Sequence, residues 1–240
     1  MNAIQTHALT RRFGEKTAVD ALELTIPEGE LFALLGVNGA GKTTTIKLLS
    51  GLLAPTAGDA ELFGVSVRAQ EVKRLLAVSP QETAVAPNLT VRENLELMAG
   101  IAGVSRKEAR LRAEKTLEEF HLREIADKRA KTLSGGWQRR LSIAMALISE
   151  PKLLFLDEPT LGLDVLARQE LWREIEALKG KITVILTTHY MEEAEQLADR
   201  VGIMAAGKLR VCGTPAELLA LSGKTRFEDA FVALAGGEAQ

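Results

Sequence analysis

The chain has 240 residues, 46% hydrophobic and 26% charged, with a formal net charge of −2. This is the composition of an ordinary globular protein, and the near-neutral balance gives no electrostatic reason to expect a nucleic-acid partner. Cys212 is the only cysteine, which excludes an intrachain disulfide and suits a reducing compartment. We expect no signal peptide, and no apolar stretch approaches the roughly 18 residues that span a bilayer.

The first thirty residues predict antiparallel strands. Short apolar pieces at residues 4–9, 17–21 and 22–26 alternate with polar residues, and turn signals stand at Gly14 and at 27–29. Phe13 lies in the first turn. Its position alone leaves two readings open, a packing aromatic or a ring on which a base stacks.

Residues 36–43 match the phosphate-loop pattern G-x-x-x-x-G-K-[ST]. An apolar run at 31–35 predicts a buried strand before the loop, and residues 44–49 predict a helix after it. At such a junction, free N–H groups and the positive end of the helix dipole favour an anion. Lys42 is suited to reach the β- and γ-phosphates, and the Thr43 hydroxyl is suited to bind Mg²⁺.

Strands and turns continue through residues 52–80, which contain Pro55, Gly58 and Gly64. The last strand, predicted at 75–79, leads to Gln81 at the opening of a loop. A polar side chain there could contact a metal or water beside the phosphate loop. The alternative is a solvated loop glutamine, which the position alone favours.

From residue 90 to 150 the pattern changes to helices. Capping boxes begin at Thr90 and Ser105. The second predicted helix is amphipathic, with Leu111, Leu117 and Phe120 on its apolar side.

Residues 133–138 predict the start of another helix. Ser134 is predicted to cap it from position 137 to about 149, and Gly135 and Gly136 permit a close approach to its N-terminus. In isolation this pattern is only a capped helix start. Arg139 and Arg140 are predicted to face solvent.

Two carboxylates directly follow the apolar run 153–156, which predicts a buried parallel strand. Asp157 is suited to the Mg²⁺ shell, and Glu158 is suited to polarise a water against a γ-phosphate. Asp164 is predicted to cap a helix through residue 178. The β-branched run 182–186 predicts a further strand, which leads to His189. A lone histidine is more often structural than catalytic.

The remainder predicts a helix carrying Met191, strands at 201–204 and 209–211, and a helix with Pro215 at its first position. Residues 222–240 predict one small packed helix.

Together these motifs resemble the nucleotide-binding subunit of an ATP-binding-cassette (ABC) transporter over nearly the whole chain. The family's marks occur in order: the aromatic loop at Phe13, Walker A at 36–43, the Q-loop at Gln81, the signature at 133–138, Walker B at 153–157 with Glu158, the D-loop at 163–164 and the switch histidine at His189. The ordered set is far more specific than Walker A alone.

The resemblance implies an α/β fold, a P-loop NTPase (RecA-like) core with an N-terminal antiparallel β subdomain and an inserted α-helical subdomain. One ABC ATPase domain would span 1–240. The core with its β subdomain would occupy 1–81 and 151–220, the helical subdomain 82–150, and a short tail 221–240.

The resemblance also implies roles, with ATP and Mg²⁺ as ligands. Glu158 would be the general base, and His189, Lys42 and Gln81 would complete the catalytic set. Thr43, Gln81 and Asp157 would organise Mg²⁺. The implied nucleotide-binding set is Phe13, Val19, Gly36, Asn38, Gly39, Ala40, Gly41, Lys42, Thr43, Thr44, Ser134, Gly135, Gly136 and Asp164.

Partners follow from the same resemblance. Ser134 and Gly136 would close over ATP held by a second subunit, most simply an identical copy, with Asp164 at the seam. Multispanning permease subunits would hold the dimer at the cytoplasmic face of the membrane. Residues 188–195 and 227–231 look most like ABC-2-type exporter ATPases, which serve drug, antibiotic, lipid or polysaccharide efflux.

Three alternatives remain open: an importer ATPase subunit, a nucleotide-gated clamp on DNA or the ribosome, and a small-molecule kinase. The clamp is disfavoured because the chain has one signature, no heptad array and no basic stripe. The kinase leaves Ser134, Gly136 and His189 unexplained.

Overall fold

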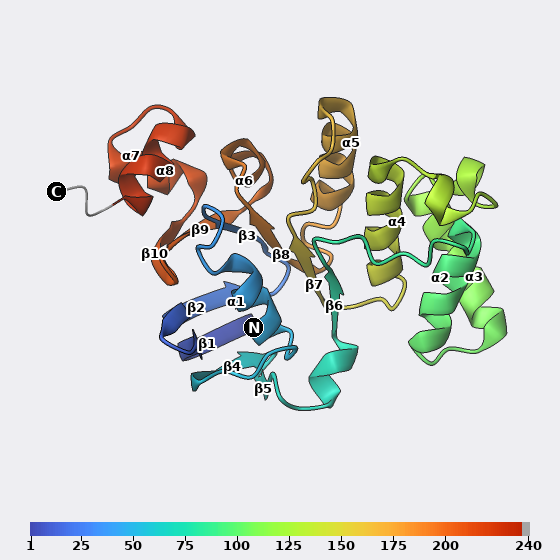
Figure 1. Cartoon of the computed structure of the whole chain (residues 1–240), viewed down its shortest axis with the longest axis horizontal. Helices are drawn as coiled ribbons and strands as arrows, with labels where there is room; N and C mark the ends of the chain where they lie inside the picture. The colour runs from blue at the N-terminus through green and yellow to red at the C-terminus, as the bar shows by residue number, and fades with distance from the viewer. Residues whose placement is uncertain (237–240) are drawn as a thin grey trace.

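Two β-sheets and a helical subdomain build the fold (Figure 1). The computed structural model describes residues 1–236, so positions 237–240 of the predicted tail lie outside the described residues. The first sheet is antiparallel, in the order β2 (Lys16–Pro27), β1 (Asn2–Phe13), β4 (Ala57–Leu62) and β5 (Val65–Ser66). The second runs in the order β10 (Lys208–Gly213), β9 (Arg200–Ala205), β3 (Leu31–Leu35), β8 (Thr183–Thr188), β7 (Leu153–Asp157) and β6 (Leu76–Ser79). Only β10 is antiparallel to its neighbour there.

Helices cover the second sheet and form the separate helical subdomain, which stands apart from the sheets in Figure 1. The α-helices are α1 (Lys42–Leu49), α2 (Val91–Ile101), α3 (Arg106–Glu119), α4 (Gly135–Leu147), α5 (Val165–Glu176), α6 (Met191–Leu197), α7 (Pro215–Ser222) and α8 (Phe227–Ala235). Short 3₁₀ turns are η1 (Glu71–Arg74), η2 (Arg123–Ile125) and η3 (Ala130–Thr132). The P-loop NTPase fold class is confirmed, with the predicted antiparallel sheet and helical insertion.

The parallel strands are buried on both faces, which explains their uninterrupted apolar runs. Alternate residues of β3 enter two different hydrophobic cores: Leu31, Ala33 and Leu35 face one core, and Phe32 and Leu34 face the other. The first core continues into the helical subdomain, and the second is shared with α1 and the antiparallel sheet. The sheet therefore carries the phosphate loop on a rigid double-sided base.

The N-terminal prediction was wrong in one respect. Residues 17–26 form one continuous strand within β2 instead of two short pieces. Ala8 and Ala21 adopt left-handed φ angles of 47° and 45°, and register shifts between β1 and β2 lie near both. These irregularities bend two long strands where the apolar pattern predicted a break.

Three expectations for the helical subdomain were also wrong. Leu111 is 59% exposed, and Ala113 and Leu117 bury the apolar side of α3 instead. Ser134 occupies the N-cap position of α4, but its side chain makes no capping hydrogen bond. The helix begins at Gly135, before the predicted start at position 137. The capping box at Thr90 is confirmed.

The arginine pair on α4 is the third correction. Arg139 and Arg140 are only 5% and 8% exposed, whereas the sequence predicted a solvent-facing pair. Each has polar partners, backbone carbonyl oxygens for Arg139 and carboxylates for Arg140, which lets a charged residue be buried.

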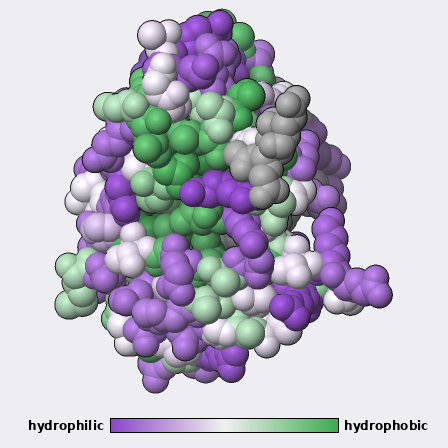
Figure 2. Space-filling model, turned by 90° about the vertical axis from the view of Figure 1, so that its left-hand side faces the viewer, coloured by the Kyte–Doolittle hydropathy of each residue, from purple (hydrophilic) through white to green (hydrophobic). Residues whose placement is uncertain are grey.

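At the other end of the molecule, α7 and α8 pack beside β10, and Figure 2 shows apolar side chains gathered on this side. Leu221 on α7 and Val232 on α8 are 65% and 67% exposed. Thr214 caps α7 in a complete capping box, with Pro215 at the first helical position as predicted. Within residues 1–236, no helix combines the length and the apolar character needed to cross a membrane.

Candidate active site

The four residues predicted to be catalytic, Lys42, Gln81, Glu158 and His189, line one cavity of about 500 Å³. The phosphate loop, Gln81, Glu158 and His189 follow the carboxyl ends of the parallel strands β3, β6, β7 and β8, which is where open α/β sheets bind ligands. Phe13, Lys16 and Ala18 come from β1 and β2 of the antiparallel sheet. The lining residues are Phe13, Lys16, Ala18, Asn38, Gly39, Gly41, Lys42, Thr43, Thr44, Gln81, Glu158, Leu161 and His189. The predicted phosphate loop, Gln81, Glu158 and His189 therefore lie together.

The phosphate loop connects β3 to α1 as predicted. Gly41 occupies the N-cap position of α1 with φ 111°, and a Cβ there would lie 2.6 Å from Met204 Cε and overlap the Ala18 carbonyl oxygen. Gly39 also has a positive φ, 82°, but nothing lies within 4 Å of a Cβ at that position. The loop is thus tightly packed behind and open toward the cavity, as a cradle for phosphate requires.

Lys42 is 5% exposed and folds back over its own loop. Its Nζ donates hydrogen bonds to the carbonyl oxygens of Gly36 at 2.7 Å and Val37 at 3.3 Å. The ammonium group is therefore fixed at the floor of the cavity. Its charge favours an anionic ligand there, next to the free N–H groups at the start of α1.

One carboxylate joins this lysine to the histidine. Glu158 Oε1 lies 3.2 Å from Lys42 Nζ, and Glu158 Oε2 lies 2.9 Å from His189 Nδ1. Glu158 is 8% exposed, so both contacts occur in a largely desolvated setting. The two contacts orient the Glu158 carboxylate inside the cavity, where a positioned carboxylate is suited to act on a water.

The backbone of Glu158 is unusual. Its φ is 46°, in the left-handed region that a glutamate rarely adopts. Its N–H donates to the carbonyl oxygen of Thr187 at 3.0 Å and to the Thr187 hydroxyl at 3.1 Å. Such conformations persist where surrounding contacts hold them, and they cluster at active sites.

The residues predicted to organise Mg²⁺ are compatible with that ion. Thr43 Oγ1 donates to Asp157 Oδ1 at 3.2 Å, and Gln81 lines the same cavity. Asp157 Oδ1 also accepts a hydrogen bond from Thr187 Oγ1 at 2.5 Å, which fixes the carboxylate. A hydroxyl, a carboxylate and an amide oxygen form the hard donor set that Mg²⁺ shares with phosphate oxygens and water.

One residue predicted to contact the nucleotide does not line the cavity. Val19 is completely buried in the core, whereas Lys16 and Ala18 line the cavity. Successive side chains of a strand point to opposite faces, so Val19 faces inward where its neighbour Ala18 faces the ligand. Gly36 and Ala40 are also buried, within the loop itself.

The remaining predicted residues form a second, separate group. Ser134, Gly135, Gly136 and Asp164 do not line the cavity. A Cβ at Gly136 would lie 3.3 Å from Ala167 Cβ, so the start of α4 packs beside the start of α5. Asp164 caps α5 by accepting a hydrogen bond from the Ala167 N–H at 2.9 Å, as predicted.

Two residues near the active site were missed by sequence reasoning. Thr187 orients both Asp157 and Glu158, and its place at the end of a predicted strand was a usable signal. Arg139 reaches the same loops from α4, but nothing in its local sequence separates it from Arg140.

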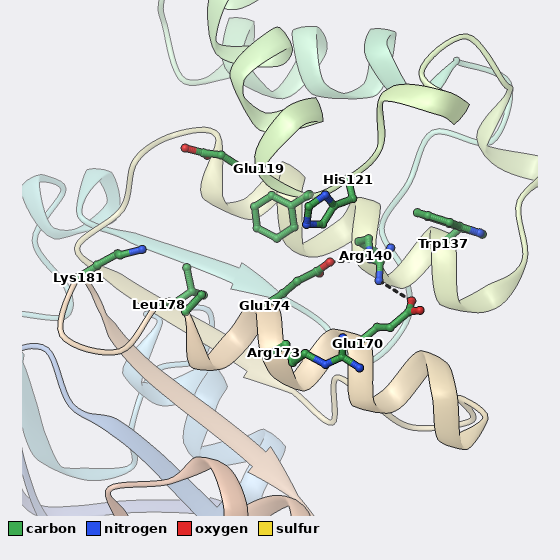
Figure 3. Close-up of a pocket in the computed structure, with 11 residues that line it drawn as sticks. Glu119, His121, Trp137, Arg140, Glu170, Arg173, Glu174, Leu178 and Lys181 are labelled. Atoms are coloured by element: carbon green, nitrogen blue, oxygen red, sulfur yellow. Dashed lines mark hydrogen bonds and ion pairs between the residues drawn. The ribbon is translucent and has the colours of Figure 1, made fainter.

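A second cavity, of about 650 Å³, lies between α5 and the ends of α3 and α4 (Figure 3). Arg140 contacts Glu170 at 2.9 Å and Glu174 at 2.8 Å there. Burial raises the pKa of Glu174 to about 7, although Arg140 opposes the shift. None of the predicted site residues lines this cavity.

Comparison with known proteins assigns the family. A family model described as ABC transporter matches residues 19–161. The daunorubicin resistance ATP-binding protein DrrA3 of Streptomyces coeruleorubidus is 42% identical over 94% of this chain and 72% of its own length. The Nod factor export ATP-binding protein I of Paraburkholderia xenovorans is 42% identical over 91% of this chain and 73% of its own length.

Longer relatives and solved structures give the same result. ABC transporter A family member 2 of Arabidopsis thaliana is 43% identical over 95% of this chain, which spans only 24% of that protein. A solved ATP-binding subunit of an ABC transporter superposes with a TM-score of 0.85 at 29% identity, covering 97% of this chain and 99% of that one. The chain therefore belongs to the ABC transporter family, as an ATP-binding subunit that hydrolyses ATP.

Proposed function

We propose that two copies of this chain close around two ATP molecules and thereby power an exporter. The observation that carries this proposal is the separation of the two predicted groups. Lys42, Glu158 and His189 share a cavity, while exposed Ser134 and Gly135 begin α4 elsewhere on the surface. A helix start with free N–H groups suits an anion, and a second copy would bring it to the phosphates.

Each residue of the cavity has a definite task in this proposal. Phe13, which is 48% exposed, offers its ring to adenine. Lys42 and the loop N–H groups bind the phosphates, and Thr43, Asp157 and Gln81 hold Mg²⁺. When bound, Mg²⁺ supplies charge neutralisation at the phosphate oxygens.

Glu158 accepts the proton of the attacking water, and His189 holds Glu158 and contacts the γ-phosphate. Both carboxylate oxygens already have a partner on this chain, so the base is oriented before the water attacks the γ-phosphate. Proton acceptance by a positioned carboxylate contributes roughly 10²- to 10⁴-fold to such reactions.

Export is favoured by what the relatives are named for, daunorubicin resistance and Nod factor export. In the proposal, multispanning permease subunits bind the chain at the cytoplasmic face of the membrane. The helical subdomain, residues 82–150, transmits the closure, and the loop after Gln81 is the contact.

The test has two parts. Tagged chain is captured from detergent-solubilised native membranes and the co-purifying chains are identified. A multispanning permease without an extracytoplasmic binding protein supports the proposal. A permease with such a binding protein contradicts export, and recovery of ribosomes, DNA or only soluble partners contradicts the transporter role.

The second part measures closure directly. The Glu158→Gln variant is mixed with ATP and Mg²⁺, and its mass is followed by light scattering. We expect the mass to double with ATP, and not to double when Ser134→Arg is added to block the start of α4. A monomer under all conditions contradicts the paired arrangement.

A further inference from the structure

Arg139 makes an unusual set of contacts for a buried arginine. It projects from α4, in the helical subdomain, and its guanidinium donates to backbone carbonyl oxygens of two core loops. Nε bonds to Pro159 at 2.8 Å, Nη2 bonds to Asp157 at 2.8 Å, and Nη1 bonds to Pro80 and, at 3.3 Å, to Gln81. One side chain therefore ties the helical subdomain to the ends of β6 and β7.

The carbonyls it holds are placed on both sides of the reactive groups. The carbonyls of Asp157 and Pro159 belong to the residues on either side of Glu158. Those of Pro80 and Gln81 belong to Gln81 itself and the residue before it. Glu158 has φ 46°, a conformation that needs external support. Fixing the carbonyl before and the carbonyl after Glu158 supplies that support.

The charge of Arg139 has no direct carboxylate contact. Among residues 1–236, Arg139 takes part in no ion pair within 4.0 Å. Burial lowers its pKa to about 10, while the charges of Asp157 and Glu193 oppose that shift. The side chain is thus cationic at neutral pH, and a buried cation held only by carbonyl dipoles is costly unless every donor is well directed.

We infer that Arg139 is a positioning residue for ATP hydrolysis, which uses its planar guanidinium to hold the Glu158 and Gln81 loops in register with α4. The inference rests on the proposed roles of Glu158 and Gln81. Arginine presents five donors in a rigid fork, whereas the lysine ammonium is a compact and strongly hydrated charge. Movement of α4 with the helical subdomain would therefore shift the backbone on either side of Glu158.

Arg140 provides a matched control. It is the next residue of the same helix and is nearly as buried, but Figure 3 shows its side chain directed into the cleft beside α5. There it pairs with Glu170 and Glu174 and stacks on Trp137 at 4.6 Å from the ring centre. None of these partners lines the cavity of Lys42 and Glu158.

The test compares Arg139→Lys, Arg139→Met and Arg140→Lys in the full chain. We expect kcat to fall about tenfold for Arg139→Lys and about 10²-fold for Arg139→Met, the scale of a misplaced reactive group. The KM for ATP should stay within about threefold, because the phosphate loop is untouched. The Mg²⁺ concentration for half-maximal turnover should rise several-fold in both, and Arg140→Lys should keep wild-type kcat and Mg²⁺ dependence.

Thermal unfolding and nucleotide binding, measured on each variant, distinguish a loss of folding from a loss of positioning. If Arg139→Met does not fold, Arg139→Lys decides. Wild-type kcat in Arg139→Lys would overturn the inference, because charge alone would then be sufficient. Equal losses in kcat for Arg139→Lys and Arg140→Lys would also overturn it, because general damage to α4 would explain both.

Two further measurements separate this inference from its premises. In the Glu158→Gln background, Arg139→Lys should leave ATP-driven pairing unchanged, and loss of pairing would place its effect at the start of α4 instead. If Glu158→Gln alone retains hydrolysis, the proposed function of Glu158 fails. If that variant is inactive but Arg139→Lys is not impaired, only the positioning role fails.

Discussion

His189 Nδ1 lies 2.9 Å from Glu158 Oε2, although 30 residues separate them along the chain. The two residues follow the neighbouring parallel strands β8 and β7, whose register pairs Asp157 with Thr187. The sheet thereby brings a carboxylate and an imidazole side by side from distant parts of the sequence. Lys42 Nζ contacts the other oxygen of the same carboxylate, Glu158 Oε1, at 3.2 Å.

Glu158→Gln should reduce ATP hydrolysis by about 10²-fold or more, the scale of losing a general base. The amide keeps the size of the side chain, so ATP binding should survive. Phosphate release and nucleotide affinity are measured on the same sample. Near-normal turnover would show that another group accepts the proton.

Gly41→Ala should destabilise the chain more than Gly39→Ala. Both positions have a positive φ, 111° at Gly41 and 82° at Gly39, so each substitution carries a backbone cost of about 1–2 kcal/mol or more. Only at Gly41 would the new Cβ meet Ala18 and Met204, which should add about 1–3 kcal/mol. Urea unfolding of both variants measures the difference, and equal losses would contradict the packing argument.

Glu174→Gln should make stability less dependent on pH. Burial raises the pKa of Glu174 from 4.5 to about 7. The protonated form is therefore favoured in the folded state, so its contribution to stability is complete below pH 4.5 and is lost as pH rises through 7.

Between pH 5 and pH 8, the advantage of Glu174→Gln over the wild type should grow by about 1–3 kcal/mol, reduced by the partial exposure of the group. Urea unfolding across this range measures it. Glu170→Gln is the control, because Glu170 contacts the same Arg140 but is 54% exposed. If the difference in unfolding free energy between Glu174→Gln and the wild type stays constant with pH, the raised pKa of Glu174 is contradicted.

Glu193→Ala should destabilise the fold much more than Glu193→Gln. Glu193 is fully buried on α6, and its Oε1 accepts hydrogen bonds from Thr160 Oγ1 at 2.8 Å and Trp172 Nε1 at 2.9 Å. Alanine leaves both donors buried without an acceptor, which should cost about 2–4 kcal/mol.

Glutamine keeps one acceptor oxygen and removes the charge. Burial raises the pKa of Glu193, so the loss for Glu193→Gln should be under about 1 kcal/mol and smaller still at high pH. Thermal unfolding at pH 6 and pH 8 tests this. Equal destabilisation by the two substitutions would show that the hydrogen bonds contribute little.

Local sequence determined the elements and the reactive groups. Continuous apolar runs marked β3, β7 and β8, because a strand covered on both faces has no polar side. The glycine spacing with Lys42 predicted the phosphate loop, and the acids after β7 predicted the carboxylate that we propose as the base, because such chemistry depends on residue type and immediate neighbours. Capping residues such as Thr90 and Thr214 placed helix starts for the same reason.

Tertiary structure alone decided which side chains meet. Arg139 and Arg140 are adjacent residues of the same type. Arg139 binds the loops around Glu158, whereas Arg140 binds Glu174. Val19 is buried and its neighbour Ala18 lines the cavity, because the face of a strand that meets the core is set by what packs against it. The hydrogen-bond partners of Arg139 lie 18 to 59 positions away in the sequence. The residue pattern within one helix or strand contains no information about such distant contacts.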